Sequence, residues 1–199
     1  LRKQSAELGN VFDWFEINKK FSKYKEMLHK MVNKGDKIAM GYLGCIYALD
    51  NDFDNASKFF ELGASQKDVS SCEALYYLYM NEFMEKEIPE KYVDKKRALT
   101  YGKQATALGH ADIANKMGVI YDEGKIVPKD MTEAIKYYEI AVSYGNTFAC
   151  NNLASCYRDG NGVEQNYEKA VELYKKAAEQ GYAGAQNELG VLLFRGDGV

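Results

Sequence analysis

Hydrophobic and small residues recur along the chain with a period of 36 residues. Three glycines, Gly109, Gly145 and Gly181, are each followed by core-type residues at offsets +4, +8, +9 and +12. The residues at these offsets are Ile113, Met117, Gly118 and Tyr121, then Ala149, Leu153, Ala154 and Tyr157, then Ala185, Leu189, Gly190 and Leu193. Such offsets fall on one face of a helix with 3.6 residues per turn, so we predict a helix, called helix A, after each glycine. The small residue at +9 lets a second helix approach closely.

A second helix, called helix B, is predicted between each helix A and the next repeat glycine. Turns rich in glycine follow each helix A at Gly124, Gly160 and Gly196. Glycine can take positive φ there and end the helix. After the first two turns, small and aromatic residues again stand at helical spacing, namely Ala134, Tyr137, Tyr138 and Ala141, and Ala170, Leu173, Tyr174, Ala177 and Ala178. The repeating unit is therefore a pair of helices.

The same register extends upstream with changes in loop length. An alanine of helix B stands 11 residues before each repeat glycine, and the same count from Ala56 places a repeat start at Lys67. Gly35 opens another repeat, and a longer loop from Phe83 to Tyr92 separates helix A from helix B after Lys67. Loops absorb such insertions at little cost.

We therefore predict one all-α domain over residues 1–199, cut from a longer protein. Its repeats start near residues 35, 67, 109 and 145, and residues 181–199 form an incomplete repeat whose apolar face awaits further repeats or a cap. Residues 1–34 form a degenerate unit. It opens at residues 3–9 with the end of an earlier helix B and contains a helix from about Phe21 to Lys34.

Composition indicates an ordered protein that does not bind nucleic acid. The chain is 46% hydrophobic and 28% charged, which is typical of a folded protein. A net charge of -3 leaves no cationic field for a phosphate backbone. No apolar run approaches the roughly 20 residues of a membrane span, so we expect no direct membrane insertion by this fragment.

The cysteines and histidines predict neither a disulfide framework nor a metal centre. Cys45, Cys72, Cys150 and Cys156 lack C-x-x-C spacing, and His29 and His110 have no second ligand nearby in sequence. We expect reduced, buried thiols, no metal and no cofactor. Reduced thiols favour a cytoplasmic compartment, although a signal or anchor can lie outside this sequence.

The repeat resembles the Sel1-like repeat family, a relative of tetratricopeptide repeats. The resemblance is carried by Ala-Cys-Asn-Asn-Leu-Ala-Ser-Cys-Tyr-Arg-Asp-Gly-Asn-Gly-Val at 149–163 and Asn-Tyr-Glu-Lys-Ala-Val-Glu-Leu-Tyr-Lys-Lys-Ala-Ala-Glu-Gln-Gly at 166–181. It implies a right-handed superhelical solenoid of antiparallel helix pairs with A helices on the concave side. It also implies a non-catalytic scaffold or adaptor that binds proteins or peptides, which is an analogy of fold.

The helix A face opposite the core stripe is the candidate binding surface, at offsets +3, +6, +10 and +13. Asparagine occupies +6 in three consecutive repeats and can donate to and accept from the main chain of an extended peptide. The predicted partner-binding residues are Tyr77, Asp112, Asn115, Phe148, Asn151, Arg158, Asn187 and Phe194. The alternative is that the asparagines are solvated or tie neighbouring A helices together.

Two short motifs offer alternative functions. Ser22-Lys-Tyr-Lys25 fits S-x-x-K, where a lysine can activate a serine for acyl transfer, and some cysteine-rich relatives of the family have been associated with β-lactams. Those relatives have regularly paired cysteines, which this chain lacks. Residues 50–61 resemble a calcium-binding loop, with Asp50, Asp52, Asp54 and Glu61 as ligands, but Asn55 stands where glycine is expected. An acidic turn with Asp54 or Asn55 as the cap of helix B explains the same residues.

Overall fold

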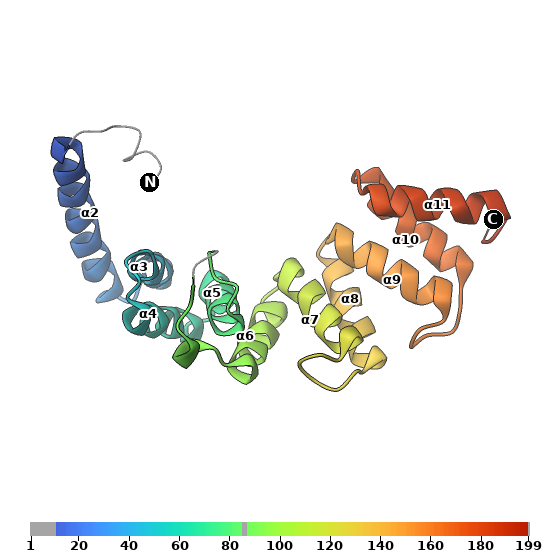
Figure 1. Ribbon diagram of the computed structural model, residues 1–199, viewed down its shortest axis with the longest axis horizontal. Coiled ribbons are helices and arrows are strands. Elements are labelled where there is room, and N and C mark those ends of the chain that lie inside the picture. Colours follow the sequence, from blue (N-terminus) through green and yellow to red (C-terminus); the bar gives the residue numbers. More distant parts are fainter. Residues whose placement is uncertain (1–10, 85–86, 199) are drawn as a thin grey trace. The chain divides into compact units, whose positions relative to one another are not determined.

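The computed structural model describes residues 11–84 and 87–198, and all regular secondary structure in that part is helical (Figure 1). The prediction of an all-α repeat protein is confirmed. The chain divides into two compact units, Leu1–Leu75 and Tyr76–Val199. The predicted end of an earlier helix B, at residues 3–9, lies outside the described residues. That the whole chain forms one domain stays a prediction.

The first unit contains α2 (Val11–Val32), α3 (Lys37–Leu49), α4 (Phe53–Ser65) and the start of α5 (Val69–Met80). Helices α3 and α4 are helix A and helix B of the repeat that starts at residue 35. Leu28 of α2 joins their core, which also holds Ala39, Leu43, Ile46 and Phe59. Helix α2 begins at Val11 rather than near residue 21, because no glycine or proline interrupts residues 11–32.

In the second unit, six α-helices follow the long loop, in which Glu90–Tyr92 forms one turn of 3₁₀ helix. The helices are α6 (Lys95–Ala107), α7 (Ala111–Glu123), α8 (Met131–Ser143), α9 (Thr147–Asp159), α10 (Tyr167–Glu179) and α11 (Ala183–Arg195). Each helix from α6 to α10 packs on the helix that follows it in sequence. Figure 1 shows α7, α9 and α11 as the successive A helices and α8 and α10 as the B helices between them.

A small residue facing an aromatic ring brings helix A close to helix B in both units. A Cβ atom added at Gly118 would lie 2.5 Å from Cε1 of Tyr138 in α8. One added at Gly44 would lie 2.5 Å from Cδ1 of Phe60 in α4. Both distances are far inside van der Waals contact, so only glycine fits. The close approach predicted from offset +9 is confirmed at these two positions.

The ends of the helices follow the sequence signals, with one correction. Gly124, Gly160 and Gly196 end α7, α9 and α11 with φ of 71°, 71° and 75°, as predicted. The cap of α4 is Asp52, whose carboxylate accepts a hydrogen bond of 3.1 Å from the main-chain nitrogen of Asn55. Asp54 and Asn55 were the predicted caps, but α4 already begins at Phe53 and places both inside its first turn.

Lys67 provides a test of the repeat register, because it stands where the other repeats have glycine. Its φ is 60°, whereas Gly145 at the equivalent position has φ of 82° and no neighbouring atom within 4 Å of an added Cβ. We expect Lys67→Gly to raise the free energy of unfolding by about 0.5–1 kcal/mol and Gly145→Ala to lower it by a similar amount. Urea unfolding followed by circular dichroism measures both changes.

Lys67→Ala is the control, because it removes the side chain but keeps a Cβ atom at positive φ. It should leave the free energy of unfolding almost unchanged. Equal stabilisation by Lys67→Ala and Lys67→Gly would show that the side chain, not the backbone conformation, is unfavourable.

Candidate functional site

The structure places all eight predicted binding residues at or near the surface of the second unit. Tyr77 lies on α5, Asp112 and Asn115 on α7, Phe148, Asn151 and Arg158 on α9, and Asn187 and Phe194 on α11. None of the eight is buried, which helical spacing alone predicts for the face opposite the core stripe. Phe194 is 94% exposed and Phe148 is 55% exposed.

Part of this face holds neighbouring A helices together. Asn152 of α9 donates a hydrogen bond of 3.0 Å from Nδ2 to Oδ1 of Asn115 on α7. Asn146, the cap of α9, donates one of 2.6 Å to Asp112, and Lys116 of α7 lies 3.2 Å from the carboxylate of Glu82. The side chains of Asn115 and Asp112 therefore form hydrogen bonds between neighbouring repeats, and such contacts between repeats are called ties below. For Asn115 this is the alternative in which the asparagines join neighbouring A helices.

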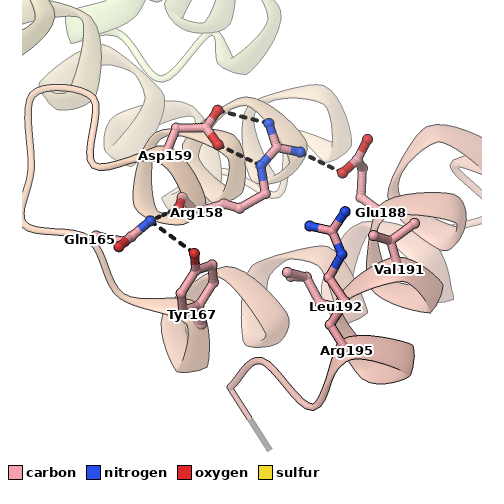
Figure 2. Close-up of a pocket in the computed structure, with 8 residues that line it drawn as sticks. All are labelled: Arg158, Asp159, Gln165, Tyr167, Glu188, Val191, Leu192 and Arg195. Carbon is pink, nitrogen blue, oxygen red and sulfur yellow. Dashed lines mark hydrogen bonds and ion pairs between the residues drawn. The ribbon is translucent and has the colours of Figure 1, made fainter.

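Arg158 is also engaged within the protein, as Figure 2 shows. Its Nε and Nη2 donate to the two carboxylate oxygens of Asp159 at 2.7 and 2.8 Å, and its Nη1 donates to Glu188 of α11. The bond to Asp159 raises the pKa of Arg158 and lowers the pKa of Asp159. These residues line a pocket of about 320 Å³ together with Gln165, Tyr167, Val191, Leu192 and Arg195. Arg158 acts as a tie between repeats and as a wall of this pocket.

Asn151 and Phe148 differ from these ties. The side chain of half-buried Asn151 makes no hydrogen bond within the described part of the chain, and only its main-chain oxygen accepts one, from Ser155. The ring of Phe148 rests edge-on against the ring of Tyr182, with centroids 5.3 Å apart. Because Phe148 and Asn151 stand three residues apart on one helix, an amide and an aromatic surface lie side by side.

Three other predicted residues occupy different surroundings. The ring of Tyr77 lies edge-on to the ring of Tyr76, and the ammonium group of Lys116 lies 5.2 Å from the centroid of the Tyr77 ring. Asn187 and Phe194 line a hollow of about 470 Å³ along α11, with Gln186, Gly190, Val191 and Arg195. The eight residues thus lie in several different local environments rather than forming one uniform binding surface along the A helices.

Sequence reasoning missed the residues at offset +7, which carry most of the ties. Lys116, Asn152 and Glu188 occupy this offset in α7, α9 and α11, and each reaches a residue of an earlier repeat. The sequence signal for them is a polar residue at +7 in all three helices, next to the core-type residue at +8. The predicted binding face was defined by offsets +3, +6, +10 and +13 and therefore left these residues out.

The two motifs that offered alternative functions are not assembled into sites. Lys25 lies 3.3 Å from Asp50 and 3.7 Å from the centroid of the Tyr47 ring, so its contacts are with these residues. Asp52 caps α4 and Glu61 lies within that helix. Among the described residues, no group of three or more His, Cys, Asp or Glu side chains could hold a metal ion.

Cys45 is the most accessible of the four cysteine side chains. Cys72, Cys150 and Cys156 are buried, whereas Cys45 is half-buried. Burial raises the pKa of every one of them, to about 11 for Cys72, and the negative charge of Asp68 raises the pKa of Cys45 and Cys72 further.

This arrangement determines how the thiols should react with iodoacetamide. Only the thiolate is nucleophilic, so with a raised pKa the rate at Cys45 should still be rising with pH at pH 9. Cys45 should react first at every pH because the other three thiols are buried. Mass spectrometry of timed samples measures both effects. A rate that levels off well below pH 9 would contradict the raised pKa.

The ties predict a difference between two asparagines that the sequence alone treats as equivalent. Asn115→Ala should lower the free energy of unfolding by about 1 kcal/mol, because it removes the bond to Asn152. Asn151→Ala should change it by less than about 0.5 kcal/mol. A double-mutant cycle with Asn152→Ala, measured by urea unfolding, isolates the bond. No coupling between Asn115 and Asn152 would show that the bond contributes nothing.

The second unit defines the class of the protein as a helical-repeat solenoid, built from stacked pairs of helices. Residues 111–146, 147–182 and 183–199 match the family model of the Sel1 repeat. Residues 111–199 therefore carry Sel1 repeats, and the resemblance seen in the sequence is confirmed. No curated protein matches the chain.

Solved structures of similar proteins belong to the same class. A protective antigen of uropathogenic Escherichia coli, c5321, with an SLR fold, is 31% identical, with a TM-score of 0.75 over 88% of this chain and 37% of the antigen. A Sel1 repeat protein from Oxalobacter formigenes is 25% identical, with a TM-score of 0.68 over 85% of this chain and 69% of that one. Helicobacter pylori cysteine rich protein B is 25% identical, with a TM-score of 0.50 over 67% of this chain and 96% of that one.

Sel1 repeat proteins generally mediate protein–protein interaction and are generally non-catalytic. This chain spans little more than a third of the length of the E. coli antigen. Among the described residues, no helix combines the length and apolar character needed to cross a membrane.

Proposed function

We propose that this chain is a non-catalytic scaffold that binds an extended segment of a partner protein across α9 of the second unit. The observation that carries the proposal is the pair formed by Asn151 and Phe148. The equivalent of Asn151 in the preceding repeat, Asn115, is used in a tie, whereas the carboxamide of Asn151 makes no hydrogen bond within the described residues. It remains available to a ligand.

The chemistry of the pair fits a peptide main chain. A carboxamide donates through nitrogen and accepts through oxygen, so Asn151 can pair with the carbonyl and N–H groups of one extended residue. Phe148 offers an exposed apolar ring that Tyr182 holds from the side. An aromatic ring that is already packed on one edge loses little conformational freedom on binding, which favours its use as an anchor.

The surroundings support recognition rather than catalysis. Arg158 is engaged by Asp159 and Glu188 at one end of the face, and Ser155 bonds to Tyr174 and to the main chain of Asn151. Arg158 thus joins α9 to α11, and Ser155 joins α9 to α10. The net charge of -3 supports a protein partner and not a nucleic acid.

Phe148→Ala and Asn151→Ala test the proposal. Each should weaken partner binding about five- to thirtyfold, which corresponds to about 1–2 kcal/mol for an interface anchor. Affinity capture followed by mass spectrometry identifies proteins retained by the parent chain, and titration calorimetry with a purified partner then measures the loss.

The control is Asn161→Ala, which removes an exposed asparagine from the loop after α9. Circular dichroism should show that all three variants are folded. If a partner binds the parent, Phe148→Ala, Asn151→Ala and Asn161→Ala equally well, the face of α9 is not the binding site.

A further inference from the structure

After Lys37 at its start, helix α3 in the first unit contains no charged residue, and one side of it is partly exposed. The side of α3 that faces the core is buried, including Leu43 and Ala48 at 0% exposure. Yet Ile38 is 59% exposed, Tyr42 56% and Leu49 37%. A helix that is hydrophobic all round is normally buried all round.

Three exposed residues and the half-buried Cys45 form one row, here called the α3 stripe: Ile38, Tyr42, Cys45 and Leu49. Their spacing of three or four residues aligns them along the helix axis. The row is about 16 Å long at 1.5 Å per residue, or about three helical turns. A contiguous apolar surface of this kind on a protein is typical of an interaction site, whereas single exposed apolar residues are common.

The same offsets are mostly polar in the second unit. The residues equivalent to the α3 stripe are Asp112, Lys116, Val119 and Glu123 in α7, and Phe148, Asn152, Ser155 and Asp159 in α9. At offset +7, Lys116 and Asn152 tie neighbouring helices, whereas Tyr42 stands at that offset in α3 with more than half of its surface exposed. The repeat fold therefore does not require an apolar residue at these positions.

Negative charge borders the α3 stripe on the side of α5. A Cβ atom at Gly41 would lie 3.3 Å from Oδ2 of Asp68, so the start of α5 passes close to the middle of α3. Asp68 and Glu73 are both near enough to Cys45 to raise its pKa, after the larger effect of burial. At the end of the stripe, Asp50 is paired with Lys25 at 3.3 Å.

We propose that the α3 stripe binds an amphipathic helix of another protein. The apolar side chains of that helix, spaced three and four residues apart, pack against Ile38, Tyr42 and Leu49, and lysine or arginine residues on its flank face Asp68 and Glu73. Such a helix buries a complementary apolar row of about three turns and supplies the opposite charge. The site shares no residue with the proposed site on α9, so either can fail without the other.

The test uses the full chain and designed peptides of about 16 residues, long enough to form a helix over the stripe. One peptide has leucines in an i, i+4, i+7, i+11 row with lysines beside it. A second has glutamates in place of the lysines, and a third has the composition of the first in scrambled order. None contains cysteine. Fluorescence anisotropy measures binding, and the rate of Cys45 alkylation reports whether the bound peptide covers the stripe.

We expect the lysine peptide to bind saturably and to slow the alkylation of Cys45. The glutamate peptide should bind at least about tenfold more weakly, and the difference should shrink in high salt. Ile38→Lys and Tyr42→Lys should each weaken binding by about tenfold or more. Leu62→Lys is the matched control, because it places the same charge at an exposed apolar position of α4 and should leave binding unchanged.

Four results would overturn the proposal. Equal binding of the scrambled peptide, or equal binding by Ile38→Lys, Tyr42→Lys and Leu62→Lys, would show that the stripe is not a specific site. Binding that leaves Cys45 alkylation unchanged would place the peptide elsewhere. Self-association of the parent chain that is lost in Tyr42→Lys, measured by sedimentation velocity, would identify a second copy as the occupant. Phe148→Ala should affect none of these measurements.

Discussion

The contact between a small residue of helix A and an aromatic ring of helix B governs the geometry of the repeats. Tyr138 lies over Gly118, and Phe60 lies over Gly44, at distances that leave no room for a Cβ atom. Close packing of this kind fixes both the separation of the two helices and their rotation about their own axes. The face that each helix A presents outward follows from this contact.

Residues outside the core stripe of the A helices fall into two groups. In the second unit, Asn152 and Glu188 connect consecutive A helices, so part of the polar surface stabilises the stack. Residues such as Asn151 and Phe148 lie near these ties at a defined spacing, but their side chains form no hydrogen bond between repeats within the described part of the chain. A repeat protein can therefore change its binding surface by substitution at a few offsets while its core stays the same.

The two units differ at one such offset. Tyr42 in α3 and Asn152 in α9 share one offset, but one is an exposed ring and the other is a tie to Asn115. The neighbouring small residues Gly44 and Ala154 are buried in both repeats. The small residue is required by helix packing, whereas the residue at the other offset can differ from repeat to repeat.

The helices, their pairing and their glycine ends were determined by the sequence alone, because spacing of 3.6 residues and positive φ are local properties of the chain. The cap of α4 is Asp52 rather than Asp54 or Asn55, a small error because helix ends depend on competing local signals. The start of α2 at Val11 rather than near residue 21 is a larger one, because residues 11–20 lack the repeat pattern used to place the other helices. Only the tertiary structure distinguished Asn115 from Asn151 and showed that Tyr42 is exposed. Hydrogen bonds between repeats and exposure to solvent depend on residues of other helices, so no pattern within one helix determines them.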